Sequence, residues 1–575
     1  MKTINYPYRS SKILNHSYLT TVISTVLTAI APLVATLVDG LFASHMLGTE
    51  AFNAVNVVMP LLNAVCVLTM ICNMGGSVLA ASQLAKGDIG KANQIFTLSI
   101  ISSVAVAFTA TIAIFFFLAD ISDFFSTNEE NAGYIREYLG ILLSYFLLVP
   151  FTTTLNNFVS VEGNPRLITR VVILANILNI LLDISFIYVF DFGIRGLALA
   201  TVFSAVVNIL LIIPHFVKGK SQYRVVRLER GKGELLAENL KHGFGFNVFS
   251  IATNIFMIVC NEMIAQTLGK ESLTLFGVCL QIQSLTFAFT MGLCIAGISL
   301  IGYLRAEGDR EGVLLILSKS LNNVIVFYAA LAALMTLVPQ FFLSLFGIEG
   351  ITASEARLPF FCYSVYYFCF CFISVYVTLS FQLSGRVGAK ILFVFGICIC
   401  SYLCMSVLTI VSPQWLWYGL ILGSIPVLLL SLAYGYSLYK RNPLLSKFTV
   451  SNTFPECVEL SMSPKANSAD VDVVVRAINI FADTCEMSES IRRDILRTFN
   501  ALLRDISENN RKEGQVFDFF MRENADNYEL IVKDNGSPFD PTDTLPTDTL
   551  LRILTYRFIF GMNVSSVKWR KPQCH

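Results

Sequence analysis

Charged residues are scarce in this chain. Asp, Glu, Lys and Arg make up 14% of its 575 residues and hydrophobic residues 55%, whereas roughly 25% of a soluble protein is charged. The mean hydropathy is +0.65. The deficit is confined to residues 18–440, which hold long apolar stretches, while residues 441–575 have the composition of a soluble sequence. The composition therefore excludes a soluble fold for most of the chain and predicts a membrane domain followed by a soluble one.

Signals of several other protein classes are absent. Of the 14 cysteines, 11 lie in apolar segments between Cys66 and Cys404, and none forms a CxxC or an alternating Cys/His pattern. We therefore expect buried free thiols rather than disulfides or a metal centre. No cleavable signal peptide is expected, because the first apolar segment is full length and lacks a small-residue cleavage site. The formal net charge of +1 averages two unlike regions and therefore says nothing about a nucleic-acid partner. We expect no nucleic-acid partner.

The first 440 residues contain an internal repeat. Four segments of the first half recur in the same order in the second half, at offsets of 221 to 223 residues. Three of the paired segments begin at Leu47 and Leu268, Gly87 and Gly308, and Glu162 and Ser384, and in the fourth pair Gly196 of FGIRGLALA matches Gly419 of WLWYGLILG. A membrane chain built from two similar halves favours a transporter, in which substrate binds between halves that rock against each other.

Twelve segments are long enough to cross a membrane as helices, which takes roughly 20 residues each. They lie at about 18–43, 51–84, 92–118, 134–161, 166–190, 194–217, 243–268, 272–303, 312–346, 355–383, 386–411 and 415–440. We predict an all-α polytopic membrane protein with twelve transmembrane helices in two parallel six-helix repeats, plus a small C-terminal α/β domain. The predicted domains are a first bundle (1–217), a cytoplasmic linker (218–242), a second bundle (243–440), a second linker (441–464) and the C-terminal domain (465–575).

The distribution of basic residues predicts the orientation of these helices. About 21 Lys and Arg residues lie at one set of helix ends, seven of them in the linker Lys218–Lys241, against four at the opposite ends. The richer side is predicted to be cytoplasmic. Both termini and the linker between the halves then face the cytoplasm, and the protein is expected in the cell membrane, in contact with its lipids.

Acidic side chains inside apolar helices are the candidate functional groups, because a carboxylate in hydrocarbon costs several kcal/mol. Asp39 and Asp183 are the clear cases. Asn176 and Asn179 share a helical face with Asp183, and Thr201 of the next helix is predicted at the same depth, roughly 10 Å below the external surface. Oxygen groups of this kind suit a hard cation or a proton. Alternatively, Asp39 only caps a helix end and Asp183 only bonds a neighbouring helix.

Three further features carry alternatives of their own. Pro32, seven residues before Asp39, permits a kink that either responds to Asp39 or is static. Glu262 is an additional candidate for cation coupling, or else an interfacial, solvated carboxylate. The aromatic run at residues 359–372 either lines a drug cavity through cation–π contacts or is packing or lipid-facing surface.

Several segments together follow a known pattern. In the first half they are APLVATLVDGLFASHMLGTEAFNAV, GGSVLAASQLAKGDIGKA, VEGNPR and NILLDISFIYVFDFGIRGLALATVFS. The second half keeps SLIGYLRAEGDREGV and SFQLSGRVGAK but has GFGFNV where a proline is usual. Over about 420 residues the chain resembles the multidrug and toxic compound extrusion (MATE) family. The resemblance implies two bundles, export of organic cations in exchange for Na⁺ or H⁺, and a cation- or proton-binding group at Asp39, Asn179, Asp183 and Thr201.

The C-terminal residues have the pattern of a small α/β module. SESIRRDILRTFNALLRDISENN is predicted as a helix, and QVFDFFMRE and YELIVKDNG as strands. VKDNGSPFDP resembles the nucleotide motif of the GHKL superfamily of histidine kinases and anti-sigma-factor kinases. This resemblance implies that Asp534 recognises adenine, that Gly536 lets the nucleotide approach, and that GMNVSSVKW is the last strand.

The same module departs from the GHKL pattern. Ala501 stands where that pattern has its catalytic glutamate, Asp505 where it has an asparagine for Mg²⁺, and the glycine-rich phosphate loop is lacking. We expect no ATP hydrolysis and no phosphotransfer. Binding of a cytoplasmic protein partner, or weak nucleotide sensing, stays open.

The leading hypothesis is a secondary active multidrug efflux transporter that is not an enzyme, needs no cofactor, and exchanges small organic cations for Na⁺ or H⁺. A second hypothesis is a lipid-linked oligosaccharide flippase of the same superfamily. Such flippases tend to have cationic cavities, whereas this chain shows acids and no cluster of intramembrane Arg or Lys. A third is a membrane-tethered signalling or sensor protein.

Overall fold

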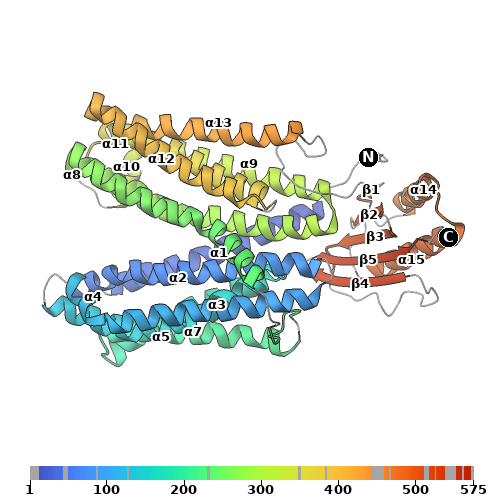
Figure 1. Ribbon diagram of the computed structural model, residues 1–575, viewed down its shortest axis with the longest axis horizontal. Coiled ribbons are helices and arrows are strands. Elements are labelled where there is room, and N and C mark those ends of the chain that lie inside the picture. Colours follow the sequence, from blue (N-terminus) through green and yellow to red (C-terminus); the bar gives the residue numbers. More distant parts are fainter. Residues whose placement is uncertain are drawn as a thin grey trace. The chain divides into compact units, whose positions relative to one another are not determined.

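The structure is a computed structural model, and it describes residues 12–42, 49–85, 88–125, 129–219, 221–228, 233–346, 351–382, 385–441, 459–464, 468–509, 517–524, 526–537, 552–559 and 562–571 (Figure 1). These ranges are called the described residues. The chain divides into two compact units. The membrane unit comprises residues 22–307 and 317–452, and the appendage unit comprises residues 1–21, 308–316 and 453–575.

Helices dominate the first 441 residues. In chain order they are α1 (Lys12–Phe42), α2 (Thr49–Ala85), α3 (Ile89–Phe116), α4 (Leu118–Phe125), α5 (Glu129–Val161), α6 (Pro165–Ile184), η2 (Ser185–Val189), α7 (Ile194–Val217), α8 (Gly233–Glu307), α9 (Arg310–Leu337), α10 (Pro339–Leu345), α11 (Ala353–Val377), η3 (Thr378–Gln382), α12 (Val387–Val411), η4 (Pro413–Trp415) and α13 (Tyr418–Arg441). Within the described residues, twelve helical segments are long and apolar enough to span a membrane, which confirms the predicted number. Two of the twelve belong to α8, which is kinked at Gly269, where φ is 78°.

Two of the predicted spans end earlier than expected. The segment 312–346 breaks at Val338, because the following Pro339 disfavours helical geometry in the residue before it. Helix α10 then begins with Pro339 in its first turn, where a missing N–H costs nothing. The segment 92–118 breaks at Phe117, between α3 and α4. Each predicted half therefore carries a short helix after its third long helical segment.

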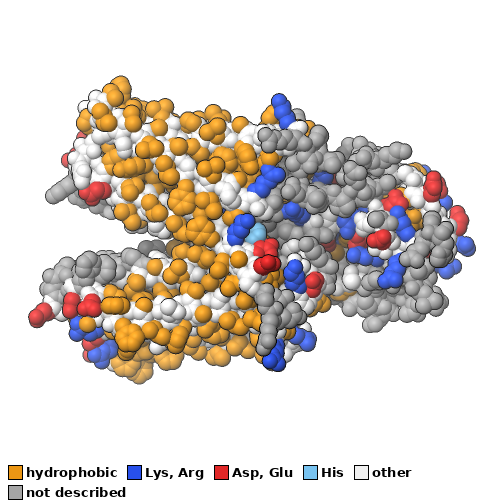
Figure 2. All heavy atoms as spheres, in the orientation of Figure 1, with side chains coloured by type: hydrophobic (Ala, Val, Ile, Leu, Met, Phe, Trp, Pro, Cys, Tyr) orange, Lys and Arg blue, Asp and Glu red, His pale blue; other side chains and the backbone are white. Residues whose placement is uncertain are grey.

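The surface of the helical bundles is apolar. Large side chains such as Phe116 and Ile410 are 75% and 85% exposed, as expected of residues that face lipid. Figure 2 shows apolar side chains over most of the visible face of the bundles and charged side chains near their ends. It also shows that the two bundles diverge at the end where α4 lies, leaving a cleft between them.

Helices α2 and α8 cross at glycines. A Cβ added at Gly243 of α8 would overlap the Ile71 carbonyl oxygen, and one added at Gly75 of α2 would overlap the Asn239 carbonyl oxygen. Beside the crossing, Asn239 Nδ2 donates to Ser99 Oγ of α3 at 3.0 Å. Small residues at such crossings allow the close packing that drives helix association in membranes. A helix of the first predicted half is thus fixed against a helix of the second.

The segment between the predicted halves is bound to helices of the first. Asn93 Oδ1 and Thr97 Oγ1 of α3 accept backbone N–H groups of residues 221–228 at 2.8 and 3.0 Å. Glu162, at the end of α5, is bound to His215 Nε2 and Ser221 Oγ, both at 3.1 Å. This part of the linker therefore has a fixed course along α3, α5 and α7.

The C-terminal domain is an antiparallel sheet with two helices. The strands are β1 (Glu459–Met462), β2 (Asp518–Glu523), β3 (Asn527–Asp534), β4 (Arg552–Ile559) and β5 (Met562–Arg570), in the order β1-β2-β3-β5-β4. The helices are α14 (Ser468–Thr484) and α15 (Glu489–Asn509). The expected helix and strands are found as α15, β2, β3 and β5. Strand β1 lies inside residues 441–464, which the sequence analysis assigns to a linker, yet it pairs with β2.

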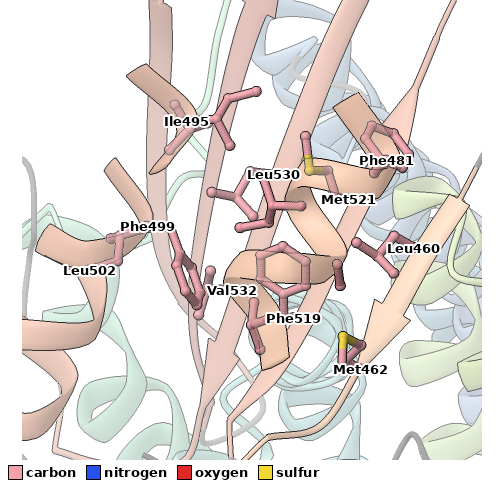
Figure 3. Packing of buried hydrophobic residues seen from close by; sticks show 14 of the residues in the cluster. Leu460, Met462, Phe481, Ile495, Phe499, Leu502, Phe519, Met521, Leu530 and Val532 are labelled. Carbon is pink, nitrogen blue, oxygen red and sulfur yellow. The ribbon is translucent and has the colours of Figure 1, made fainter. Parts of the chain in front are cut away.

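One face of this sheet packs against α14 and α15 (Figure 3). The alternating apolar residues of β2 and β3 supply the sheet side of the core, as the two-residue period of a strand requires. The core includes Leu460, Met462, Phe481, Ile495, Phe499, Leu502, Phe519, Met521, Leu530 and Val532. The intervening residues of β2 and β3 lie on the second face of the sheet.

Replacing Gly243 by alanine is expected to destabilise the protein, because the added methyl group would overlap the Ile71 carbonyl oxygen and force α2 and α8 apart. Overpacking of this kind costs about 1–3 kcal/mol. Gly277→Ala in the same helix is the control, since no atom lies within 4 Å of its added Cβ. Thermal unfolding in detergent should give a lower midpoint for G243A than for G277A. Equal midpoints would contradict a tight crossing.

Candidate functional site

Asp183 is buried at the end of α6. It is 0% exposed, and Asn179, one turn earlier on the same helical face, is 5% exposed. Helix α6 begins with Pro165 in its first turn and is otherwise mainly apolar. A carboxylate buried in a membrane-spanning helix is costly, which makes Asp183 a candidate functional group.

Helix α6 continues directly into the π-helical turn η2. The Phe190 N–H donates to the Ser185 carbonyl oxygen at 3.1 Å, which is the wider bonding pattern of a π turn. Such turns are rare, and many of them lie at functional sites. The sequence carries no recognisable signal for this turn, which follows Asp183 by two residues.

Thr201 lies on α7, which packs along α6. Thr201 Oγ1 donates to the Leu197 carbonyl oxygen at 3.1 Å, and Ser204 Oγ donates to the Thr201 carbonyl oxygen at 2.9 Å. On α6, Asn176 Nδ2 donates in the same way to the Val172 carbonyl oxygen at 2.7 Å. Each side chain gives a hydrogen to its own helix, so its oxygen still has lone pairs that can accept a donor or bind a cation.

The remaining predicted residues are placed differently. Asp39 belongs to α1, but its side chain lies outside the described residues. Pro32 is exposed, and α1 continues through it to Phe42. Glu262 is exposed on α8 and is hydrogen-bonded to Gln266 one turn later, as a solvated carboxylate would be.

A cluster of amides inside the membrane unit escaped the sequence analysis. Asn73 of α2 accepts from Asn157 Nδ2 at 2.7 Å and donates to Thr153 Oγ1 at 2.9 Å, both on α5. Asn156 Nδ2 donates to Asn208 Oδ1 of α7 at 3.3 Å. Asn208 follows Thr201 by seven residues, which is about 10 Å along a helix. Isolated asparagines in apolar segments are visible in the sequence. Which of them hydrogen-bond to one another depends on the packing of α2, α5 and α7.

The aromatic run of α11 is packed inside the membrane unit. Tyr363, Tyr366 and Tyr367 are each no more than 2% exposed. Tyr367 Oη donates to the Gln283 carbonyl oxygen at 3.2 Å, and Tyr328 Oη of α9 donates to the Thr286 carbonyl oxygen at 3.0 Å. These bonds satisfy phenol groups that would otherwise be costly to bury. The structure thus favours the packing alternative for this run.

The polar groups at α6 and α7 fit a proton or a small hard cation. They offer a carboxylate (Asp183), an amide (Asn179) and a hydroxyl (Thr201), all with oxygen atoms of the kind that hard cations prefer. Within the described ranges, no three His, Cys, Asp or Glu side chains come together. These oxygen groups are of the type that a hard cation or a proton prefers, whereas soft transition metals prefer sulfur and imidazole ligands.

The second candidate site, in the appendage, is filled by its own side chains. Asp534 is 2% exposed, and its Oδ1 accepts from the Gly536 N–H at 2.8 Å and from Asn563 Nδ2 at 2.9 Å. Tyr556 Oη in turn donates to Asn563 Oδ1 at 2.7 Å. In this arrangement Oδ1 of Asp534 ties β3 to β5 through Asn563 and is already used by two donors of the protein itself.

Position 501, where the GHKL pattern has its catalytic glutamate, also argues against nucleotide chemistry in the appendage. Ala501 on α15 packs against the hydrophobic core of the sheet. Asp505, one turn later, is 3% exposed. Burial also raises the pKa of the Cys485 thiol at the end of α14 to about 12, so this cysteine is not a reactive thiolate.

Comparison with known proteins gives one family match. The model of the MatE family matches residues 24–185 and 248–411. The multidrug export protein MepA of Staphylococcus saprophyticus is 26% identical over 292 residues, which are 50% of this chain and 62% of that protein. MepA of Staphylococcus aureus is 24% identical over 301 residues, 51% of this chain and 64% of that protein. The chain thus matches slightly less than two thirds of the length of these relatives.

Solved structures share the fold. A crystal structure of MATE in the bent conformation has a TM-score of 0.67 at 20% identity, covering 76% of this chain and 98% of that one. An outward-facing multidrug resistance MATE transporter of the MOP superfamily also has a TM-score of 0.67 at 20% identity, with coverage of 77% and 99%. A MOP superfamily transporter from Pyrococcus furiosus has a TM-score of 0.64 at 20% identity, with coverage of 76% and 98%.

The appendage is expected not to hydrolyse ATP. The alanine at position 501, which packs against the core, supplies no base to activate a nucleophile, and Oδ1 of Asp534 already accepts from Gly536 and Asn563. Purified full-length protein should release phosphate from ATP at the same background rate as its Gly536→Arg variant. Phosphate release or phosphotransfer that G536R abolishes would show that the appendage is an active nucleotide enzyme.

Proposed function

Because this chain belongs to the MatE family of secondary transporters, we propose that it exports amphipathic organic cations across the cell membrane in exchange for Na⁺ or H⁺. The observation that carries this proposal is Asp183, fully buried in a membrane-spanning helix. Two relatives of the chain are multidrug export proteins by name, which supports small organic compounds as cargo.

We propose further that the helices form two parallel six-helix repeats with both termini in the cytoplasm. Matching details at the offset of the sequence repeat support this arrangement. Asp88 caps α3 by accepting the Lys91 N–H, and Asp309 caps α9 by accepting the Gly312 N–H, both at 2.9 Å. A short helix follows each of these, α4 in one half and α10 in the other. With this orientation the cleft beside α4 (Figure 2) opens to the outside.

The proposed coupling site consists of Asp39, Asn179, Asp183 and Thr201, with Asn176 and Glu262 as additional candidates. When a proton or Na⁺ enters from outside, it removes the cost of the buried carboxylate and favours one packing of α1, α6 and α7. The release of drug accompanies that packing, so drug and cation must each weaken the binding of the other. The amide cluster around Asn73 would extend this polar path toward the cytoplasmic side without adding charge.

The flippase alternative is favoured by one observation. Lys390, in the first turn of α12, is 2% exposed, and a buried lysine suits an anionic phosphate. The acid at Asp183 and the exposed Glu262 favour cationic cargo instead. The third hypothesis, a sensor, draws on the appendage, and transport measured with and without residues 453–575 would separate it from a transporter.

Export is tested in proteoliposomes that contain the purified protein. A fluorescent organic cation should move against its gradient when a Na⁺ or pH gradient of the right sign is imposed. A fluorescent lipid with an anionic headgroup is the parallel substrate for the flippase alternative. If neither gradient drives any of a panel of cationic dyes, the export proposal fails. Movement of the anionic lipid alone would replace it with the alternative.

Asp183→Asn is expected to abolish gradient-driven export, because it keeps the side chain's shape and removes the group that binds the coupling ion. Coupling free energies of about 1–3 kcal/mol correspond to roughly 5–150-fold changes in affinity. Asp39→Asn should have the same effect or nearly so. Asp191→Asn is the matched control, since Asp191 is exposed and has a φ of 52°, which asparagine tolerates. Wild-type rates in D183N and D39N would move the coupling site elsewhere, with Glu262 as the next candidate.

A further inference from the structure

The sheet of the appendage is buried on both faces. The face opposite α14 and α15 carries Phe520, Ile531 and Lys533, which are 5%, 2% and 2% exposed. An antiparallel sheet with one solvated face would show exposed polar residues at these alternate positions. This second face is therefore covered by residues other than those of α14 and α15.

The turn between α8 and α9 lies against this second face. Asp309, the residue before α9, pairs with Lys533 of β3 through Oδ2 and Nζ at 3.4 Å, and both side chains are 3% exposed. Residues 308–316 belong to the same compact unit as the sheet. Since charges are seldom buried unless they are paired, this contact defines where the turn sits on the sheet.

A second basic residue of the sheet meets the same turn. Gly308 has a φ of 80°, and a Cβ added there would overlap the Arg522 guanidinium of β2. Arg522 Nε donates to Glu529 Oε2 at 2.6 Å, and Ser566 Oγ donates to Glu529 Oε1 at 3.0 Å. The guanidinium is thus held in place by the sheet itself, and glycine gives it room to approach the turn.

The repeat supplies an internal comparison for Asp309. Its counterpart 221 residues earlier, Asp88, caps α3 through a hydrogen bond of the same length. Asp88 is exposed, whereas Asp309 is 2% exposed. Capping a helix therefore requires neither burial nor a lysine partner, and the pair with Lys533 is a feature that the second half has in addition.

The same unit also includes the beginning of α1. Residues 12–21 group with the sheet and with residues 308–316, and Leu14 and Tyr18 of this segment are 1% and 3% exposed. Helix α1 opens the first predicted bundle and α9 belongs to the second. Because the starts of α1 and α9 both belong to the appendage unit, this unit opposes the separation of the two helices.

We propose that the second face of the sheet is a docking surface for the α8–α9 turn, and that the appendage acts as a clasp that restrains the rocking of the two halves. The clasp consists of Lys533 and Arg522 on the sheet and of Gly308 and Asp309 on the turn. The restraint on transport rests on the proposed export function, whereas the docking contact does not. Release of the clasp then speeds the transport cycle, because rocking moves the two halves relative to each other.

Asp309→Asn is the principal variant, because asparagine keeps the helix cap while it removes the charge that pairs with Lys533. Asp88→Asn is its matched control. In full-length protein in proteoliposomes, D309N should raise amide hydrogen exchange in residues 308–316 and 12–21 by about tenfold or more, since the buried Lys533 ammonium loses the carboxylate of Asp309. D88N should leave exchange in both segments unchanged. D309N should also export dye faster than wild type, and D88N should not.

Lys533→Met tests the contact from the other side. If the two side chains meet, the double variant D309N/K533M will show much less than the combined effect of the two single variants. Additive effects, or unchanged exchange in D309N, would overturn the docking contact. Raised exchange with an unchanged export rate would keep the docking and overturn the restraint. If wild type and all variants export no dye, the proposed function fails. Hydrogen exchange still tests the clasp in that case. Exchange that rises together at residues 12–21 and 308–316 in D309N supports a clasp that holds the two helices together, and a rise in only one segment contradicts it.

Discussion

The cost of a polar group in a low-dielectric interior is the constraint on which this structure depends. Inside the membrane unit, hydroxyls donate to the carbonyl groups of their own helices and amides pair across helices, as with Thr201 and Leu197 or Asn73 and Asn157. Each such bond removes a penalty of desolvation rather than adding much stability. Buried residues with charged side chains differ from these neutral polar residues, because hydrogen bonds to the same helix do not neutralise a charge.

Close packing of helices follows from the same constraint. Lipid tails are as apolar as the side chains of a membrane helix, so burial of these side chains does not drive helices together. Helices associate instead through close contact of their backbones at small residues. The crossing of α2 and α8 at Gly75 and Gly243 is such a contact, and it joins segments that lie on either side of the linker. The GFGFNV segment, where the sequence departs from the family by lacking a proline, thus has a packing role that only the structure reveals.

Much of the fold could be predicted from sequence, because it depends on local signals. The number of spans follows from hydropathy, and α15, β2 and β3 follow from their helical and alternating patterns. The break at Val338 was also local and could have been read from Pro339. Strand β1 was not predicted, because its four residues are too few to show a clear two-residue alternation. They form a strand because they pair with β2. The amide cluster and the pair of Asp309 with Lys533 join residues far apart in sequence, and no local pattern records such contacts.

Two buried acids illustrate how far sequence reasoning reaches. Asp183 stands out in sequence because its neighbours are apolar, and the structure shows it fully buried on α6. Asp309 does not stand out in sequence, because GDREG is an ordinary helix start like its counterpart GDIGK. In the structure Asp88 is exposed, whereas Asp309 is buried. The difference between Asp88 and Asp309 arises only when Lys533, 224 residues later, approaches the second of them. Where the sequence repeat pairs two aspartates, as it does Asp88 and Asp309, a charge that is buried at one position and exposed at the other therefore points to a function that only one of them has.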